Sequence, residues 1–522
     1  MRPHLLFRNR DFYPQWGMLL KFPTPTRWRD RDYEEQWASL PHIQRMVIQD
    51  LELEILFQSM AQGDRYLYEV AKNAVLLSVP DTDTILYRQG ILKDCIRNLD
   101  VIREIFRICD ETIEEYFKEL TWYSGKSADS VRGTSIRALT LFTGKLVVLR
   151  KVAEDHGGMF ESEGFREFFA MLKRELTDEY LLCLNTTLKE LSLPAGACIT
   201  AELGKGNKGI NYTLQRCKEI PPQTWIARFF SIEPSSQYSF TIAERDIAGF
   251  QALAKMRGRG LDPVSNILHQ STDHILRFFT SLKSELAFYL GCINLREELI
   301  HLGEPVCFPL PREPGERALT CKGLYDPCMA LQKKQVVIGN DVNAEEKDLV
   351  IVTGANRGGK STFLRSVGLA QLMMQCGSCV PAESYCADVC CGIFTHFKRE
   401  EDHAMRSGKL DEELARMSEI VDHLIPDSMV LFNESFAATN EREGSEISRQ
   451  IVCALLKKRV KIIFVTHLHE FSRGLFEKNM SNASFLRAER KQDGERTFRM
   501  KEGEPLQTSF GKDLYHTIFC QD

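Results

Sequence analysis

The chain has 522 residues, a formal net charge of -5, 43% hydrophobic and 27% charged residues. At roughly 100–200 residues per domain, this length predicts two to four domains, and the composition is that of a globular protein. The charge excludes a uniformly basic surface, so any contact with nucleic acid must come from a local region.

Sixteen cysteines are scattered along the chain without the regular spacing of a small disulfide scaffold. This usage indicates free thiols in a reducing cytosol. Residues 1–12 lack the apolar centre of a signal peptide, and no apolar run approaches the roughly 18–20 residues of a membrane span. We therefore expect a cytoplasmic protein with no membrane partner.

The first part of the chain favours helices. Residues 1–45 are rich in Arg, Pro, Trp and Tyr and are expected to pack onto the helices after them. From Ile43 to Leu191, apolar residues recur at steps of three and four, which predicts amphipathic helices. The clearest predicted stretches are Ile91–Ile113, Ser135–Lys151 and Gly164–Lys189.

A short β element comes after these helices. Ala197–Leu203 and Ile210–Leu214 read as strands around the glycine-rich turn Gly204–Gly209. Helical periodicity then resumes, and Leu268–Ile293 predicts a long helix with one apolar stripe. The pattern indicates a helical region over residues 46–330, interrupted by a small β element near residues 195–260.

The last part of the chain, residues 331–522, has an α/β pattern. Pro305–Pro314 is proline-rich and reads as the linker before it. Apolar strands alternate with helical segments, which predicts a largely parallel sheet. The predicted strands are Val336–Ile338, Asp348–Val352, Met429–Phe432 and Lys461–Val465.

Gly354–Ser361 fits the pattern G-x-x-x-x-G-K-S between a predicted strand and a predicted helix. Glycines allow backbone N–H groups to point at phosphate oxygens, and the helix presents its positive end to the same anion. Lys360 can reach the β- and γ-phosphates, and the Ser361 hydroxyl can ligate Mg²⁺. The sequence thus predicts a P-loop that binds ATP with Mg²⁺ through Gly354, Ala355, Asn356, Gly358, Gly359, Lys360, Ser361 and Thr362.

Asn433 and Glu434 stand at the end of the predicted strand Met429–Phe432. P-loop ATPases usually hold the Mg²⁺ shell with Asp at the first position and orient the attacking water with Glu at the second. Asn433 can accept a hydrogen bond from a metal-bound water but brings no charge, so we expect weaker Mg²⁺ binding and slow turnover. His467, after another strand, is a candidate sensor of the γ-phosphate, although a lone histidine is more often structural.

These segments resemble the MutS mismatch-repair ATPases. Thr353–Thr362 is similar to the family's T-G-P-N-x-G-G-K-S-T, and Thr466–Phe471 is similar to T-H-Y-H-E-L. Asn340–Val342 precedes the P-loop strand as in the family. Glu413 is expected to begin a helix in the family's register, and Thr439 and Gly444 match the loop after the acidic pair.

The resemblance implies a multidomain fold in which a helical core and lever, with a small clamp, joins an ABC/MutS-type ATPase domain. It also implies a homodimer in which Ser407 and Gly408 bring a helix N-terminus to the partner's nucleotide. Two departures are Asn433 in place of Asp and the lack of a recognisable mismatch-reading domain before the helices. We therefore expect slow ATP hydrolysis, catalysed with Glu434 and His467, coupled to structure-specific DNA clamping in repair or recombination. The alternative is an ATP-binding scaffold that does not cycle and switches a protein partner.

Two further clusters leave alternatives open. Lys205, Lys208, Arg216 and Lys218 either neutralise DNA phosphates or belong to an ordinary solvated turn, as does a second basic group, Lys255, Arg257 and Arg259. Cys376 and Cys379, with the cysteines after them, either hold a metal or redox site or are packing thiols.

Overall fold

The computed structural model describes residues 1–10, 12, 41–121, 127–194, 196–215, 241–399, 408–491 and 495–506. The chain forms two compact units. The first contains residues 1–3, 103–159 and 167–283, and the second contains residues 4–102, 160–166 and 284–522. Among the helices in the described ranges, none is both long enough and apolar enough to cross a lipid bilayer.

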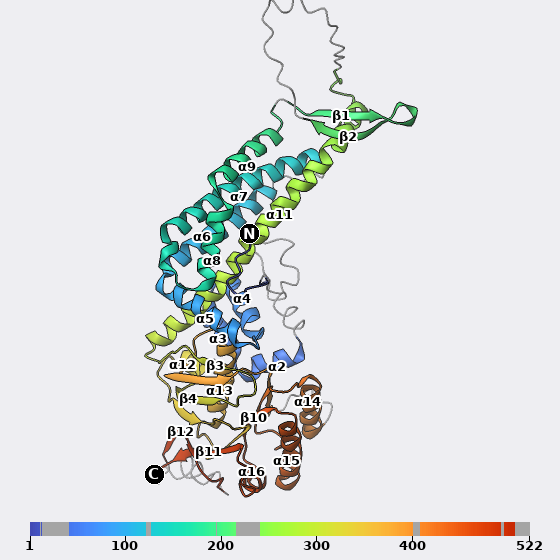
Figure 1. Cartoon of the computed structure of the whole chain (residues 1–522). Helices are drawn as coiled ribbons and strands as arrows, with labels where there is room; N and C mark the ends of the chain where they lie inside the picture. Colours follow the sequence, from blue (N-terminus) through green and yellow to red (C-terminus); the bar gives the residue numbers. More distant parts are fainter. Residues whose placement is uncertain are drawn as a thin grey trace, which may run out of the picture. The chain divides into compact units, whose positions relative to one another are not determined.

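The first unit is helical apart from one ribbon (Figure 1). Its helices pack through apolar faces, and Leu139, Leu188 and Leu268 from three of them form one buried cluster. The helices are α6 (Leu99–Thr121), α7 (Ala128–His156), α8 (Glu163–Glu175), α9 (Asp178–Leu191) and α11 (Ile247–His301); α6, α8 and α11 each share residues with the second unit.

The helical stretch predicted over Gly164–Lys189 is confirmed, and it contains two helices, α8 and α9. The Thr177 hydroxyl accepts a hydrogen bond from the Tyr180 backbone N–H and so starts α9 as an N-cap. The long helix predicted around Leu268–Ile293 is confirmed, and α11 extends it in both directions.

The predicted ribbon is confirmed. Strands β1 (Cys198–Leu203) and β2 (Gly209–Gln215) pair antiparallel. Gly206 in the turn has a φ of 71°, a value that a side chain disfavours. A Cβ on Gly260 of α11 would lie 2.8 Å from the Ile199 side chain, so only glycine lets the helix approach the ribbon this closely.

The second unit begins with buried chain and short helices. Leu5 and Leu6 are fully buried. The buried Arg88 donates hydrogen bonds to the carbonyls of Leu6, at 2.9 Å, and Cys376, at 3.0 Å. The helices are α2 (His42–Asp50), α3 (Leu53–Ala61), α4 (Arg65–Leu76) and α5 (Thr82–Arg97).

A six-stranded sheet forms the centre of the second unit, with the order β12-β11-β6-β10-β9-β8. All neighbours pair in parallel except β12, which is antiparallel to β11. The parallel sheet predicted from the sequence is therefore confirmed. The strands are β6 (Leu349–Gly354), β8 (Ile393–Phe397), β9 (Met429–Asn433), β10 (Lys461–Val465), β11 (Ala483–Arg490) and β12 (Arg496–Glu502).

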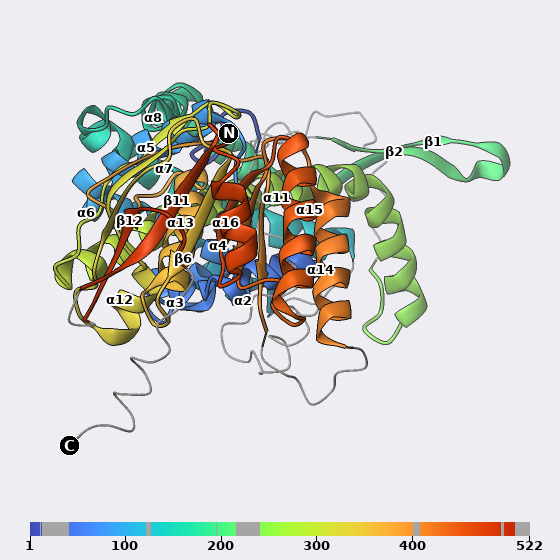
Figure 2. The ribbon, with the colours of Figure 1, turned by 90° about the horizontal axis from the view of Figure 1, so that it is seen from below.

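Helices cover both faces of this sheet (Figure 2). Val430 and Phe432 belong to the buried cluster formed with α14 (Lys409–His423), α15 (Glu441–Lys457) and α16 (His469–Phe476). Leu431 between them faces α13 (Lys360–Gln375), where a Cβ on Gly368 would lie 2.6 Å from the Leu431 side chain. The alternation of side chains along β9 thus supplies two apolar layers.

A second sheet has the order β3-β7-β4-β5. Its strands are β3 (Leu310–Arg312), β4 (Leu319–Leu324), β5 (Asn340–Asn343) and β7 (Ser384–Asp388), and α12 (Pro327–Lys333) lies between β4 and β5 in the chain. The linker predicted over Pro305–Pro314 thus contains a paired strand. The strand predicted at Val336–Ile338 was wrong, because the Val337 N–H donates to the Glu304 carboxylate instead of a neighbouring strand.

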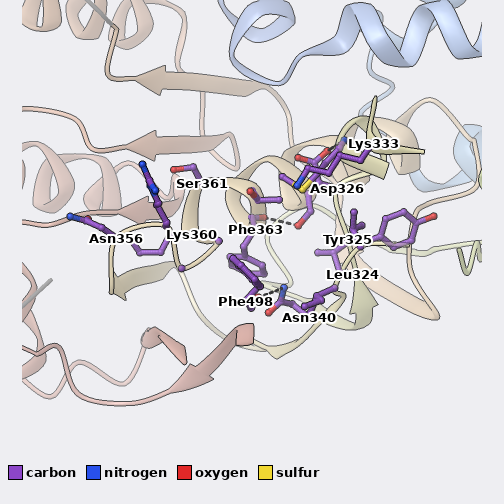
Figure 3. Close-up of a pocket in the computed structure, with 18 of the residues that line it drawn as sticks. Leu324, Tyr325, Asp326, Lys333, Asn340, Asn356, Lys360, Ser361, Phe363 and Phe498 are labelled. Carbon is purple, nitrogen blue, oxygen red and sulfur yellow. Dashed lines mark hydrogen bonds between the residues drawn. The ribbon is translucent and has the colours of Figure 1, made fainter. Parts of the chain in front are cut away.

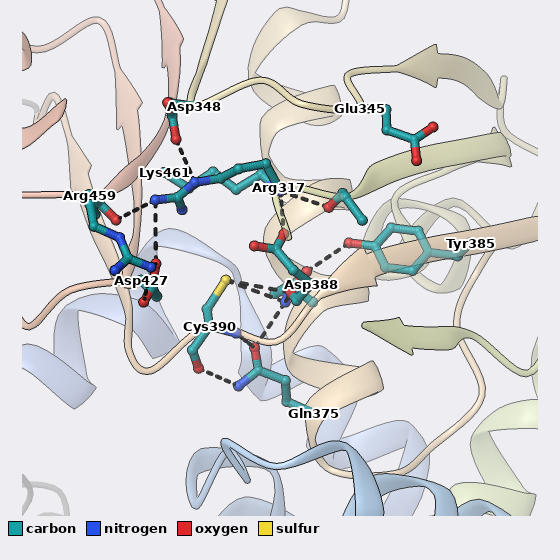
Figure 4. Close-up of polar contacts among 12 residues, drawn as sticks. Arg317, Glu345, Asp348, Gln375, Tyr385, Asp388, Cys390, Asp427, Arg459 and Lys461 are labelled. Atoms are coloured by element: carbon teal, nitrogen blue, oxygen red, sulfur yellow. Dashed lines mark hydrogen bonds and ion pairs between the residues drawn. The ribbon is translucent and has the colours of Figure 1, made fainter. Parts of the chain in front are cut away.

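Buried polar groups join the two sheets where the parallel strands begin (Figure 4). Lys461, the first residue of β10, forms an ion pair with Asp388 at the end of β7, and both side chains are at most 2% exposed. Arg317 pairs with Asp348, before β6, and with Asp427, before β9. These contacts fix the sheet at the edge opposite the carboxyl ends of its strands.

Candidate functional site

The glycine-rich loop connects β6 to α13. Its backbone requires glycine at three positions. Gly354 has a φ of 116° and Gly359 a φ of 86°. A Cβ on Gly358 would lie 2.8 Å from the Ala355 carbonyl oxygen. The loop therefore exposes main chain at the amino end of α13, the arrangement that receives phosphate.

Lys360 extends from the first turn of α13 into this loop and is 5% exposed. Its ammonium donates hydrogen bonds to the carbonyls of Gly354, at 3.1 Å, and Ala355, at 2.9 Å. Burial lowers the pKa of Lys360 to about 8. A buried ammonium that donates to these neutral carbonyls suits an anion, so the loop fits the phosphates of a nucleotide.

Ser361 and Asn433 lie next to each other at the carboxyl edge of the sheet. The Ser361 hydroxyl donates to the Asn433 side-chain oxygen at 2.9 Å. A hydroxyl and an amide oxygen are the hard donors that Mg²⁺ prefers. The pair therefore fits Mg²⁺ as predicted, but without the negative charge of a carboxylate.

Glu434 and His467 face each other from the ends of β9 and β10. The imidazole Nε2 lies 2.9 Å from a carboxylate oxygen of Glu434. The hydrogen bond from His467 lowers the pKa of Glu434, although partial burial acts in the opposite direction. Glu434 is therefore ionised at neutral pH and can orient water, while a lowered pKa makes it a weak proton acceptor.

A cavity of about 410 Å³ lies over this loop and extends beyond it (Figure 3). Lys360, Ser361, Glu434 and His467 are among its lining residues. The sequence analysis missed other lining residues, which lie in β4, in and beside α12, in the segment before β5, and in β12. They are Leu324, Tyr325, Asp326, Met329, Val337, Ile338 and Phe498. The cavity thus continues past the phosphate loop into a more apolar region.

Phe498 is the clearest missed residue. It lies on β12, a strand that the sequence analysis did not predict, with a φ of 58° and a side chain 44% exposed. A Cβ on Gly359 would lie 3.5 Å from this side chain, so the ring stands beside the phosphate loop. An exposed aromatic ring there can stack on a flat heteroaromatic group.

Gly408 is the N-cap residue of α14, and Ser407 lies outside the described residues. Within the described residues, the Gly408 N-cap has no side-chain hydrogen bond. Asp411 and Glu412 lie in the first turn, where their charges already complement the helix dipole. The helix begins at Lys409, four residues before the predicted Glu413.

The loop after Glu434 is packed tightly. A Cβ on Gly444 of α15 would lie 2.4 Å from the Phe436 carbonyl oxygen, so α15 can approach this loop only with glycine there. The Thr439 hydroxyl donates to Glu443, and Asn440 caps α15. The residues that the family pattern singled out at 439 and 444 thus shape the loop instead of lining the cavity.

Lys205 and Lys208 are exposed in the turn between β1 and β2 of the first unit. Arg216 and Lys218 lie outside the described residues. In the second group, Arg257 pairs with Asp129 and the Arg259 guanidinium lies 5.5 Å from the Tyr212 ring centre. Among the described residues of the ribbon, Lys205 and Lys208 are the exposed basic side chains, whereas the second group lies on α11.

Cys376 and Cys379 are buried, and burial raises their thiol pKa values to about 11 and about 12. These values keep both thiols protonated. Across the ranges that the structure describes, no three His, Cys, Asp or Glu side chains gather as a metal site. The geometry favours packing thiols.

Comparison with known proteins gives two family matches. Residues 80–302 match the MutS2 N-terminal domain, and residues 350–517 match MutS domain V. The chain is 25% identical over 337 residues to a DNA mismatch repair protein MutS of Prochlorococcus marinus, covering 63% of this chain and 36% of the relative. It is 36% identical over 138 residues to the protein of that name from Microcystis aeruginosa, covering 26% of this chain and 15% of the relative.

A third relative, a DNA mismatch repair protein MutS of Leptospira interrogans, is 28% identical over 210 residues, which is 39% of this chain and 25% of the relative. The chain therefore spans 36%, 25% and 15% of the length of these three curated relatives.

Proposed function

The chain belongs to the MutS family, and on that premise we propose that it binds ATP with Mg²⁺, hydrolyses it slowly and couples the cycle to DNA clamping as a homodimer. The observation that carries the proposal is the buried Lys360 ammonium inside a glycine loop at the amino end of α13.

The residues at and beside the phosphate loop have proposed roles. The N–H groups of the loop and Lys360 hold the β- and γ-phosphates, and Phe498 stacks on the base. Ser361 would ligate Mg²⁺ and Asn433 would hold it through a water, and the ion would offset charge on the phosphate oxygens. Glu434 orients the attacking water, and His467 holds the Glu434 carboxylate until the γ-phosphate competes for the imidazole.

Slow turnover is expected from two features of this site. Asn433 leaves the metal without a protein carboxylate on β9. The hydrogen bond from His467 lowers the pKa of Glu434, so the carboxylate accepts a proton from water less readily. Both features act on the chemical step more than on nucleotide binding.

The proposed DNA contact rests on the ribbon of the first unit and on the relatives, whose names place them in mismatch repair. The exposed Lys205 and Lys208 would neutralise backbone phosphates, together with Arg216 and Lys218. Such contacts read charge and shape, so the preference would be for a DNA structure instead of a sequence. In the dimer, Ser407 and Gly408 would present the amino end of α14 to the partner's nucleotide.

One experiment separates this proposal from a scaffold that binds ATP without cycling. ATP turnover is measured alone and with linear, mismatched and branched duplexes, with Lys360→Ala as the control. We expect the parent to turn over ATP and Lys360→Ala to abolish this turnover. At least one of the DNA structures should change the parent's rate. Tight ATP binding without turnover under all four conditions would favour the scaffold.

A further inference from the structure

His396 lies behind Glu434 and away from the nucleotide cavity. It sits on β8, is 1% exposed, and faces Ser435, which is fully buried after β9. Its Nδ1 lies 2.7 Å from the Ser435 hydroxyl, and its Nε2 lies 2.9 Å from the Glu413 carbonyl of α14. One imidazole therefore joins α14 to the residue directly after Glu434.

The hydrogen-bond roles at His396 can be assigned. The Glu413 carbonyl only accepts, so Nε2 must carry a hydrogen. In the neutral ring Nδ1 then carries no hydrogen, and the single Ser435 hydroxyl hydrogen is shared between Nδ1 and the His396 main-chain carbonyl, which lies 2.6 Å from the hydroxyl oxygen. Burial, with a smaller contribution from Arg416, lowers the pKa of His396 to about 4, which keeps the ring neutral at physiological pH.

The backbone that His396 holds is strained. Glu434 has a φ of 53° and Phe436 a φ of 61°, both in the left-handed region that non-glycine residues avoid. Such conformations persist only where the surroundings impose them. The His396 ring stacks on the Phe436 ring, with centres 5.1 Å apart and planes at 20°, and Gly444 closes on the Phe436 carbonyl from α15.

We propose that His396 is a positioning residue for ATP hydrolysis, which pins Ser435 and Phe436 so that the strained turn aims the Glu434 carboxylate at the nucleotide cavity. The inference rests on the proposed ATPase function. It assigns the effect to the chemical step, because His396 lies outside the cavity lining and the phosphate loop is carried by a different strand, β6.

Three variants test the role. His396→Phe keeps a stacking ring and the main-chain carbonyl that accepts from Ser435 but removes both hydrogen bonds of the imidazole, and His396→Gln can still donate to the Glu413 carbonyl. Ser435→Ala removes the hydroxyl from both the imidazole and that carbonyl with little loss of volume. Thr395→Val is the matched control, because Thr395 is equally buried on β8 and, within the described chain, its hydroxyl makes no hydrogen bond to the turn.

We expect His396→Phe to lower kcat roughly 100-fold, the loss typical of a reacting group displaced by about 1 Å. The dissociation constant for ATP and the unfolding temperature should stay near the parent's, His396→Gln should regain part of kcat, and Thr395→Val should match the parent. Parental kcat in both His396→Phe and Ser435→Ala would overturn the proposal. So would a loss of ATP affinity that parallels the loss of kcat.

A second readout needs no turnover and so separates this inference from the proposed function. The ¹⁵N chemical shift of His467 Nε2 reports its hydrogen bond to Glu434, with Glu434→Ala as the reference for a broken bond. In His396→Phe and Ser435→Ala the shift should move toward that reference. If the parent does not hydrolyse ATP, the ATPase proposal fails, and this shift alone decides: a parental value in both variants overturns the positioning role.

Discussion

Lys360 carries its charge in a place that burial makes unfavourable, and this has a consequence for ATP binding. Its pKa in the empty site is lowered to about 8 by burial. ATP requires the ammonium, so affinity should be constant with respect to Lys360 below that pH and fall above it, by about tenfold per unit at most. Isothermal titration between pH 7 and pH 10 measures how ATP affinity changes with pH. Lys360→Met should bind ATP weakly and should lack this pH dependence. Equal slopes in parent and variant would remove Lys360 from the phosphate site.

Asn433 offers a test of the metal. Replacing it with Asp adds a negative charge beside Ser361, worth on the order of 3 kcal/mol at about 5 Å and an effective dielectric near 20, before desolvation. Asn433→Asp should therefore reach half-maximal activity at a lower Mg²⁺ concentration. The new carboxylate also repels Glu434, but bound Mg²⁺ outweighs that repulsion. Coincident Mg²⁺ titrations for parent and variant would place Asn433 outside the metal shell.

A functional residue can be predicted from the sequence when it belongs to a motif of neighbouring residues. The loop from Gly354 to Ser361 is contiguous, so its pattern alone predicted the loop between a strand and a helix that the structure has. His396 and Phe498 contact neighbours that are distant in sequence, and neither has a local motif. Only the folded sheet places His396 beside Ser435 and Phe498 beside Gly359.

Secondary elements were predictable where burial is uniform. The central strands β6, β9 and β10 are buried along nearly their whole length because helices cover both faces, and all three were expected. The edge strand β12 is mostly exposed and was missed. The other edge strand, β8, was missed although all five of its residues are buried. Val336–Ile338 showed the opposite error, since its apolar side chains read as a strand but line a cavity instead.

The ion pair between Lys461 and Asp388 should stabilise the joint between the two sheets only as a pair (Figure 4). Lys461→Met leaves the Asp388 carboxylate buried without its cation, which typically costs about 3–5 kcal/mol. The double variant Lys461→Met with Asp388→Leu should recover a large part of that loss. Urea unfolding midpoints of the parent, the two single variants and the double variant check this, and a double variant no better than the worst single would contradict it.

At the scale of the whole molecule, the proposal assigns DNA contact to the ribbon of the first unit and chemistry to the second. Replacing Lys205, Lys208, Arg216 and Lys218 with Ala should weaken DNA binding and flatten its salt dependence, by a slope of about 0.9 per lost phosphate contact. ATP turnover without DNA should be unchanged. DNA affinity is measured from about 50 to 200 mM salt.

A matched control replaces four exposed lysines outside the ribbon with Ala: Lys173, Lys189, Lys457 and Lys478. It lowers the net charge equally, so a local role for the ribbon requires that this variant keep the parent's affinity and salt slope. Equal weakening in both variants would mean that DNA responds only to overall charge.

The central claim is that ATP is hydrolysed in the cavity over α13 and that Glu434 orients the attacking water. The most direct test is Glu434→Gln, measured for equilibrium ATP binding and for single-turnover cleavage of the γ-phosphate. The amide keeps the size of the side chain but cannot accept a proton as the carboxylate does. The account predicts parental ATP affinity with cleavage slowed by about 10²–10⁴-fold. Cleavage at the parent's rate would contradict it and would place the hydrolytic chemistry on another residue.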